Sequence, residues 1–399
     1  MSKPFGQRPP FRAEHLGSLL RPEKLLAERH AVDEGKGDQK RLAAVTNTSI
    51  VEIVREQLDL GFHAVTDGEY PRHMFWGTFW PGLEGFEEIT DFDFKDLFRL
   101  YVPDIAAFTE TGHKPGETVI CTGKIRHVKS TYVNQWNFLK NLLPAERKHE
   151  AKLTLAAPNW YHLRYQTGKA YPKEVYSSDA EYFADIAKAY QTELQILYKN
   201  GLRNVQIDDP NLAYFCSEKM LAGFKEAGED PYELFDSYIQ LYNDCLSKRP
   251  ADMHVGIHLC RGNFVGGRHF SEGGYDNIAS KLFRDLNVDT YYLEFDTPRA
   301  GGFEPLKQLP KHKNVILGLI TSKFPALENI KDIKKKVYQA AEVIGQATGE
   351  SKDEALQRLG ISPQCGFASH SDGNNIGRKE MIAKLKLVIR VAEAIWPGQ

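Results

Sequence analysis

The stretch MHVGIHLC, residues 253–260, combines an apolar, β-branched run with two residue types that bind metals. Such a run is typical of a short strand that is buried on both faces, as in parallel sheets. Alternate residues of a strand point to the same side, so His258 and Cys260 face one common space. The stretch therefore supports two hypotheses, a pair of metal ligands or two neighbouring residues of an ordinary core.

Similar apolar runs recur along the chain, and segments with helical spacing lie between most of them. We interpret eight runs as strands: FRAEHLG (11–17), FHAVTDG (62–68), KLTLAAP (152–158), RNVQIDDP (203–210), MHVGIHLC (253–260), DTYYLEFD (289–296), NVILGLIT (314–321) and LGISPQCGF (359–367). The spacing predicts helices over 45–60, 179–200, 231–248, 276–286, 328–348 and 378–395. Strands that alternate with helices predict a parallel α/β fold, and eight of them favour a (β/α)8 TIM barrel.

A long stretch separates the second predicted strand from the third. It holds one further strand candidate, VICTGKIRHV (119–128), and the aromatic segment HMFWGTFWPGLEGF (73–86). We expect a single TIM-barrel domain over residues 1–399, with an insertion at about 70–150 whose first part, 70–118, closes over the barrel mouth. No GxGxxG motif follows the first predicted strand, which argues against a dinucleotide-binding fold.

The composition excludes several classes of protein. Of 399 residues, 42% are hydrophobic and 26% charged, with a formal net charge of −2. This charge gives no basic field for nucleic acid or an anionic membrane, and no apolar run approaches the roughly 18–20 residues that span a bilayer. The N-terminal stretch lacks the apolar centre of a signal peptide. We expect a soluble, cytoplasmic protein that binds neither nucleic acid nor membrane; the sequence indicates no particular oligomeric state.

The chain contains five cysteines. An odd count, in a long chain without a secretion signal, argues against a disulfide framework. We expect Cys121, Cys216 and Cys245 to be buried apolar thiols. Cys260 and Cys365 remain as candidates for chemistry.

Polar residues gather at the carboxyl ends of the predicted strands, which in a barrel is the face that holds the active site. Asp67 and Glu69 follow the second strand, Asp208 and Asp209 end the fourth, and Glu294 ends the sixth. The alternative is that such residues cap the helices that follow. For Asp67 and Asp209 both interpretations stay open.

His258, Cys260, Glu294 and Cys365 form a candidate zinc site, because zinc prefers sulfur and nitrogen ligands and tolerates a carboxylate. Two thiolates and one carboxylate contribute −3 against the +2 of the ion, so the filled site is anionic. Such a site suits a bound substrate thiol, which a metal deprotonates. This predicts attack of a thiol on an electrophilic carbon, with Glu294 as the ligand that yields to the incoming sulfur.

These residues resemble the cobalamin-independent methionine synthase family, over its catalytic C-terminal barrel and nearly the whole of this chain. Zinc ligands in that family come from an HxC strand, a downstream Glu and a late Cys followed by Gly, which here are His258, Cys260, Glu294 and Cys365. The resemblance implies Zn2+ as cofactor, homocysteine as thiol and 5-methyltetrahydrofolate, or its polyglutamate, as methyl donor. The implied function is a zinc-dependent thiol S-methyltransferase that forms methionine.

Further motifs extend the resemblance. EHLGSLLRP implies that Gly17 and Ser18 hold the carboxylate of the amino acid, while TDGEYPR and QIDDP imply that Glu69 and Asp208 are catalytic and bind its amine. An α-ammonium that leaves water needs such charge-assisted acceptors. LTLAAPNWYH resembles the segment near the pterin side; for Trp160, packing at the barrel rim and pterin stacking both stay open.

The chain also departs from the family pattern. The family carries a catalytic His after the seventh strand, and Ile320 stands in its place here. Lys323 is either a cation near the site or a solvated lysine at a helix start, and His370 is either an acid or a surface-loop residue. HLCRGNF differs from the family's continuation, and we expect Arg261 and Asn263 to line the mouth.

Three other functions stay open. One is formation of a C–S bond between another thiol and an epoxide-type electrophile, as in related single-barrel proteins. Another is a metal-free decarboxylase of the uroporphyrinogen type, in which Arg12, Arg21 and Arg72 would bind carboxylates. The last is a barrel with a purely structural zinc ion.

Overall fold

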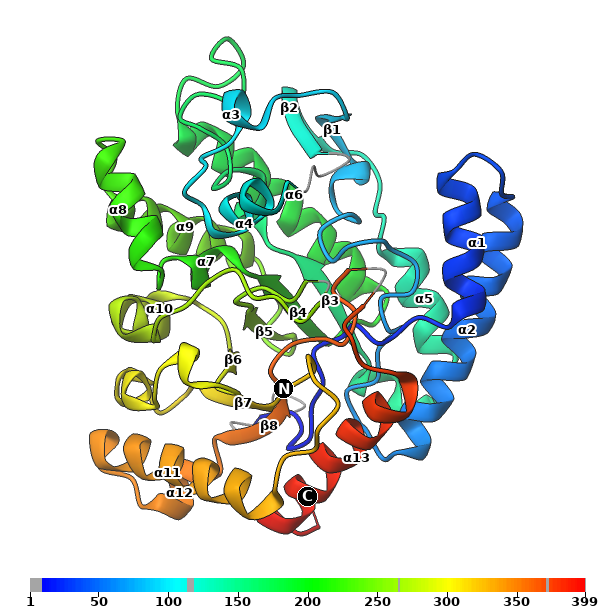
Figure 1. Cartoon of the computed structure of the whole chain (residues 1–399), viewed down its shortest axis with the longest axis vertical. Helices are drawn as coiled ribbons and strands as arrows, with labels where there is room; N and C mark the ends of the chain where they lie inside the picture. Colours follow the sequence, from blue (N-terminus) through cyan, green and yellow to red (C-terminus); the bar gives the residue numbers. More distant parts are fainter. Residues whose placement is uncertain (1–8, 113–117, 265, 371–372, 399) are drawn as a thin grey trace.

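The computed structural model describes residues 9–112, 118–264, 266–370 and 373–398 (Figure 1). Six strands form one parallel sheet in the order β3-β4-β5-β6-β7-β8. Each coincides with a predicted run, because every residue of these strands is buried, as a sheet covered on both faces requires. Their bounds are β3 Lys152–Ala156, β4 Asn204–Asp209, β5 His254–Leu259, β6 Thr290–Glu294, β7 Asn314–Ile320 and β8 Leu359–Pro363.

Helices surround this sheet in Figure 1 and include all six predicted ones, with ends that differ by a few residues. Ser178 caps α6: its side chain accepts a hydrogen bond from the backbone N–H of Glu181 at 3.4 Å. The helices are α1 Glu23–Asp33, α2 Gln39–Asp59, α3 Phe94–Leu97, α4 Pro103–Thr111, α5 Val133–Asn141, α6 Asp179–Lys199, α7 Asn211–Tyr214, α8 Glu218–Glu226, α9 Pro231–Leu246, α10 Ala279–Asp285, α11 Ile330–Thr348, α12 Lys352–Leu356 and α13 Arg378–Ile395. None within the described part of the chain is long and apolar enough to cross a membrane.

The first two predicted strands are wrong as regular strands. Segment 11–17 makes only a single parallel bridge to β8, in which the N–H of Glu14 donates to the Ile361 carbonyl at 2.9 Å. Segment 62–68 contacts β3 through one bond, from the Lys152 N–H to the Val65 carbonyl at 2.9 Å. Both segments end on a glycine with positive φ, at 99° for residue 17 and 69° for residue 68, which breaks strand geometry. The fold is thus α/β with a parallel sheet, consistent with a TIM barrel.

A second, antiparallel sheet pairs β1 Leu83–Ile89 with β2 Thr118–His127. It lies apart from the six-stranded sheet in Figure 1. The strand predicted at 119–128 is confirmed as β2, whereas β1 was not predicted, because its sequence LEGFEEI carries three acidic residues. The expected apolar thiols at positions 121, 216 and 245 are also confirmed, since all three are free and buried.

The parallel register sets the carboxyl ends of the strands side by side. Asp208 of β4 lies opposite His258 of β5, and His258 lies opposite Tyr292 of β6. Glu294, at the end of β6, lies opposite Gly318 of β7. Side chains that are far apart in the sequence therefore meet at one end of the sheet.

Candidate metal centre and substrate cavity

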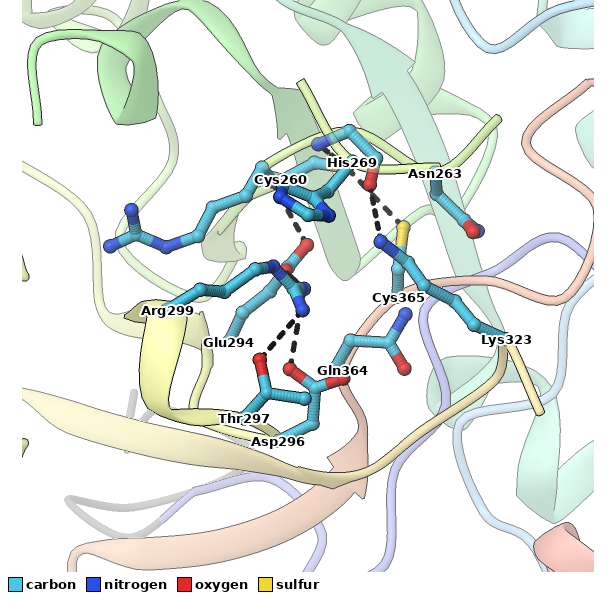
Figure 2. Close-up of polar contacts among 12 residues, drawn as sticks. Cys260, Asn263, His269, Glu294, Asp296, Thr297, Arg299, Lys323, Gln364 and Cys365 are labelled. Atoms are coloured by element: carbon cyan, nitrogen blue, oxygen red, sulfur yellow. Dashed lines mark hydrogen bonds and ion pairs between the residues drawn. The ribbon is translucent and has the colours of Figure 1, made fainter. Parts of the chain in front are cut away.

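The four predicted metal ligands come together at the carboxyl ends of three strands. His258 lies in β5 and Cys260 directly follows it, Glu294 ends β6, and Cys365 follows β8. One possible ligand atom from each lies within 4.8 Å of the others. His258 Nε2 and Cys260 Sγ each lie 3.4 Å from Cys365 Sγ. Figure 2 draws Cys260, Glu294 and Cys365 together with the polar groups around them.

This donor set fits a zinc ion. Two sulfurs, one imidazole nitrogen and one carboxylate oxygen are ligands that zinc takes in four-coordinate sites. His258, Glu294 and Cys365 are buried and Cys260 is half-buried. Because buried thiolates and carboxylates need a counter-charge, a cation at this position would stabilise the cluster. The four residues could therefore hold the metal together.

Protonation within the cluster follows from its contacts. The hydrogen bond from Cys260 and the charge of His258 hold the pKa of Cys365 well below its usual value. The same bond to Cys365, together with burial, raises the pKa of Cys260. Burial disfavours a charged His258, yet the bond to Cys365 outweighs it and raises the pKa to about 9. Cys365 is therefore poised as a thiolate, the form of cysteine that binds metals.

Glu294 is held by groups outside the cluster. Its Oε1 accepts a hydrogen bond from the backbone N–H of Arg261 at 2.9 Å, and its Oε2 accepts one from Arg299 at 2.9 Å. Its own backbone N–H donates to the hydroxyl of Tyr275 at 3.0 Å. Burial raises the pKa of Glu294, and the charges of Lys323 and Arg299 oppose that rise.

Lys323 is a buried cation beside this cluster, and the interpretation as a solvated helix-start lysine is wrong. Only 2% of the residue is exposed, and α11 begins later, at Ile330. Its Nζ donates to the carbonyl of Gly262 at 2.8 Å. Ile320, which stands where the resemblance implies a histidine, is fully buried at the end of β7.

A cavity of about 230 Å3 adjoins the metal cluster. His258, Cys260 and Cys365 form part of its wall. So do three residues that were predicted to bind the amino-acid substrate: Ser18, Glu69 and Asp208. The structure thus brings the predicted metal and substrate residues to one place.

Gly17 lies so close to Thr154 and Glu69 that no larger residue fits at this position. A Cβ atom there would lie 2.5 Å from Thr154 Cγ2 and 2.8 Å from Glu69 Oε1. Real Cβ atoms do not approach so closely, and the φ of 99° also disfavours other residues. Glycine at this position therefore allows the Glu69 carboxylate to lie against the first segment.

Glu69 adopts a strained backbone conformation. Its φ of 61° makes it the one non-glycine residue with positive φ within 9–112, 118–264, 266–370 and 373–398. Such strain costs about 1–3 kcal/mol and clusters at functional sites. The carboxylate accepts a hydrogen bond from Thr154 at 2.9 Å and lies 4.0 Å from Arg72.

Asp208 is the second acid of the cavity wall. It accepts a hydrogen bond from Gln206 at 2.7 Å. Burial and the neighbouring Glu69 raise the pKa of Asp208 to about 7, and burial also raises the pKa of Glu69. Two buried acids that resist ionisation favour a bound cation between them.

Aromatic side chains form another part of the cavity wall. Trp160 stacks on Trp76, with centroids 5.8 Å apart, and meets Phe75 edge to face at 5.0 Å. Arg164 lies over Trp160 at 4.6 Å and pairs with Asp104 at 3.0 Å. Trp160 therefore packs against neighbours and also faces the cavity. The segment predicted to close over the mouth contributes His73, Met74, Phe75, Trp76, Asp104 and Phe108 to this wall, while residues 113–117 of it lie outside the described residues.

Of the remaining candidates, only Arg261 departs from its prediction. Asn263 and His370 line the cavity, but Arg261 is fully buried with its guanidinium over the ring of Tyr275 at 4.3 Å. Asp67 and Asp209 act locally, since they accept hydrogen bonds from the N–H groups of Glu69 at 2.8 Å and Leu212 at 3.0 Å, respectively.

The arginines of the decarboxylase alternative are occupied by the fold. Arg12 bonds to the Leu359 carbonyl at 2.8 Å, Arg21 to the Arg72 carbonyl at 2.7 Å, and Arg72 to the Thr154 carbonyl at 3.2 Å. None of them belongs to the described wall of the cavity. This removes the group of free cations that several substrate carboxylates would need.

Two features of the site were not predicted from the sequence. They are the contact of Arg299 with Glu294 and the ion pair of Asp104 with Arg164. The only feature of the sequence that points to Arg299 is its position a few residues after Glu294, the candidate ligand at the end of β6. The ion pair joins residues 60 positions apart and has no local signal.

Comparison with known proteins shows which sequences this chain resembles. A sequence family described as the catalytic domain of cobalamin-independent synthase matches residues 171–394. Uncharacterized protein YxjG of Bacillus subtilis (strain 168) is 34% identical over 392 residues, which cover 98% of this chain and 96% of that protein. The methionine synthase of Pyrococcus furiosus is 21% identical over 326 residues, which cover 81% of this chain and 80% of that protein.

A solved structure gives the same result. The putative vitamin-B12 independent methionine synthase from Listeria monocytogenes superposes with a TM-score of 0.71 at 28% identity. The match covers 97% of this chain and 98% of that chain. From the family match and the full-length relative, the chain belongs to the cobalamin-independent methionine synthase catalytic-domain family.

Proposed function

We propose that this protein is a zinc-dependent thiol S-methyltransferase that moves a methyl group from 5-methyltetrahydrofolate, or its polyglutamate, to homocysteine and gives methionine. The observation that carries the proposal is one cavity wall that contains three members of the ligand set, His258, Cys260 and Cys365, and two buried acids, Glu69 and Asp208. A zinc ion held by His258, Cys260, Glu294 and Cys365 would keep a substrate thiol deprotonated. As scaffold we propose a single (β/α)8 barrel with segments 11–17 and 62–68 in the first two places and an insertion at about 70–150.

The acids orient the amino-acid end of homocysteine. Glu69 and Asp208 accept the α-ammonium, and Gly17 with Ser18 holds the carboxylate. Asp208 lies beside His258 on the neighbouring strand, so a bound ammonium would direct the thiol towards the ligand cluster. Fixing both ends of a small substrate in this way lowers the entropic part of the barrier.

The aromatic wall receives the donor. Trp76 and Trp160 offer flat faces against which a pterin ring packs with its large apolar area. During transfer, the new S–C bond forms as the methyl–nitrogen bond breaks. The electron pair stays on the donor nitrogen, which takes up one proton. His370 lines the cavity, and we assign its protonated side chain, which becomes neutral imidazole on donation, as the proton source in place of the histidine that Ile320 replaces.

The test is methionine formation from homocysteine and methyltetrahydrofolate, together with elemental analysis of Cys365→Ser. We expect about one zinc per chain in the wild type, and loss of both metal and activity in a variant that still folds. Cys121→Ser, which alters a buried cysteine in β2, serves as the matched control and should retain both. A zinc-free, active wild type would contradict the proposal.

A second candidate is transfer of another carbon electrophile to a thiol, again with zinc. Ile320 favours it, because the residue that assists the related methyl transfer is replaced by a buried aliphatic side chain. A screen of electrophiles with the same thiol separates the two. Thioether formed only from epoxide-type compounds, and no methionine from the folate, would favour the second candidate.

The structural-zinc alternative is separated by Glu294→Gln. If the ion is only structural, this variant should lose most of its thermal stability. If the proposal holds, the fold should survive, and the affinity for homocysteine should change.

A further inference from the structure

The four candidate ligands fall into two groups by their surroundings. His258, Cys260 and Cys365 contact one another, with both distances to Cys365 Sγ at 3.4 Å. Glu294 instead has a protein donor on each carboxylate oxygen, Arg261 N–H on Oε1 and Arg299 on Oε2. Three ligands thus form a compact group, and the fourth is shared with the protein around it.

Arg299 is held in place without help from the metal cluster. It lies in a short turn, Pro298–Ala300, a few residues after β6. One nitrogen donates to Thr297 Oγ1 at 2.7 Å, and the nitrogen that bonds Glu294 also approaches Asp296 Oδ1 at 3.3 Å. Figure 2 shows these contacts, with the guanidinium directed from the turn towards the carboxylates. The position of this charge is therefore set by local sequence.

The contact has a consequence for ligand exchange. Glu294 is fully buried, and a buried carboxylate without a partner strongly destabilises a protein. A thiol can displace this carboxylate only if another group stabilises its charge. Arg299 and the Arg261 N–H already do so at 2.9 Å each, so the carboxylate can withdraw without losing all its partners.

We propose that Arg299 is a positioning residue that shares the Glu294 carboxylate with the metal and thereby makes Glu294 the ligand that the substrate thiol displaces. The inference rests on the proposed function, because it requires a metal and a thiol at this site. The proposal predicts the opposite change in metal affinity from that expected of a residue that only supports a metal ligand. Loss of an ordinary outer-shell partner weakens metal binding about 10–100-fold, whereas loss of a group that competes for the carboxylate leaves metal binding equal or tighter.

The experiment uses the full chain loaded with Co2+, a spectroscopic substitute for zinc, in wild type, Arg299→Met and Arg299→Lys. Competition with a chromophoric chelator gives the metal affinity, and the cobalt–thiolate absorption gives the affinity for homocysteine. For Arg299→Met we expect unchanged or tighter metal binding and about tenfold or greater loss of thiol affinity, the scale of one charged hydrogen bond. Arg299→Lys should recover part of the thiol affinity, because it keeps the charge but not the planar fork.

Asp296→Asn is the matched control. It removes a charge beside Arg299 but keeps a side-chain oxygen that can accept the 3.3 Å contact, and it leaves the contacts with Thr297 and Glu294. Both affinities should therefore stay near wild type. Equal loss of thiol affinity in Asp296→Asn and Arg299→Met would overturn the inference, as would a parallel fall of metal affinity or an unchanged thiol affinity in Arg299→Met. If Arg299→Met does not fold, Arg299→Lys carries the test: thiol affinity equal to wild type overturns the inference.

The two proposals fail in different ways. A wild type that binds no metal at the four ligands, or binds metal but no thiol, overturns the proposed function. A wild type that binds both, with Arg299 variants identical to it, overturns only the role of Arg299.

Discussion

At the scale of single residues, direction along a strand explains which predictions succeed. His258 and Cys260 are two positions apart, and both face the cavity; Arg261 is the next residue, and it points the other way, onto Tyr275. The alternation of side chains along an extended chain therefore predicts that His258 and Cys260 lie on the same side. It also predicts that Arg261 lies on the opposite side and does not line the cavity. Arg299 could not be found in this way, because its contact with Glu294 depends on the path of a turn rather than on a period.

A substitution of Glu69 tests whether this residue binds the α-ammonium group of homocysteine. Glu69→Gln removes one charge from the pair of buried acids, so the KM for homocysteine should rise about 10–100-fold, the cost of one charged hydrogen bond. The value of kcat should change less, because the thiol end is untouched. Steady-state kinetics checks this, with a thiol that lacks the α-amine as control. An equal loss with the amine-free thiol would show that the variant damages the fold of the site.

His15 makes a second residue-scale prediction, for acid stability. Burial and the charge of Lys152 lower the pKa of His15 from 6.5 to about 3. Below pH 6.5 the unfolded chain therefore binds a proton that the folded protein does not, and stability falls with pH down to about 3. At pH 5 this amounts to about 2 kcal/mol at 1.36 kcal/mol per unit. Denaturant unfolding should show a shallower loss between pH 7 and 5 in His15→Asn.

Metal-free protein is the right sample for the His15 measurement, because metal release would fall in the same pH range. The comparison is the difference between wild type and variant, since the buried acids with raised pKa, such as Glu69 and Asp208, act with the opposite sign in both proteins. Parallel pH profiles would contradict the assignment.

At the scale of elements, the sequence predicts the helices and strands whose apolar residues recur with a clear period over a long segment. The six strands of the parallel sheet and six of its helices follow from apolar runs and helical spacing. Segments 11–17 and 62–68 have the same apolar character, but each makes only one or two backbone bonds to the sheet and is held by side chains as well. The apolar pattern does not distinguish a strand of a sheet from an extended segment with few backbone bonds. For this reason we assigned both segments as strands.

Gln57 of α2 is the side chain that fixes both segments. Its Oε1 contacts His15 Nε2 at 2.9 Å and accepts from the Thr66 N–H at 2.9 Å, while its Nε2 donates to the Thr66 carbonyl at 2.9 Å. One buried amide thus replaces the missing ladder for two elements. The helix α2, in turn, is tied to the sheet through this residue.

Gln57→Leu should therefore be strongly destabilising. It leaves the backbone N–H and C=O of Thr66 and the ring of His15 without their partner, and each unsatisfied buried group costs about 1–3 kcal/mol. We expect a loss of about 3 kcal/mol or more in the free energy of unfolding. Gln339→Ala, an exposed glutamine on α11, should stay within about 0.5 kcal/mol. A loss below 1 kcal/mol in Gln57→Leu would mean that the two segments are held by other contacts.

At the scale of the whole molecule, the cavity joins parts of the chain that no local signal connects. The proposed metal ligands in its wall are His258 in β5, Cys260 directly after β5 and Cys365 after β8. The residues proposed to bind the amino acid are Ser18, Glu69 and Asp208. Its aromatic wall comes from residues 73–76 and 108 together with Trp160 and the loop after β5. The metal ligands could be predicted because strand ends meet by rule, and the amino-acid residues from the family resemblance. The aromatic segment was expected over the mouth, but no simple pattern predicts the course of residues 70–112 or which of their side chains line the cavity.

Because the aromatic wall and the metal cluster come from different segments, we expect that a substitution can weaken binding of the methyl donor without weakening binding of the thiol. Trp160→Ala removes the ring that stacks on Trp76 and faces the cavity, so the KM for methyltetrahydrofolate should rise about tenfold or more, on the scale of a lost aromatic contact at a binding site. The homocysteine affinity of the Co2+ form should stay within a factor of about two, because no predicted thiol or amine contact involves this ring. Trp160→Phe keeps an aromatic face and should recover most of the donor affinity. A parallel loss of thiol affinity in Trp160→Ala would show that the aromatic wall supports the metal end, and that the cavity acts as one unit rather than two.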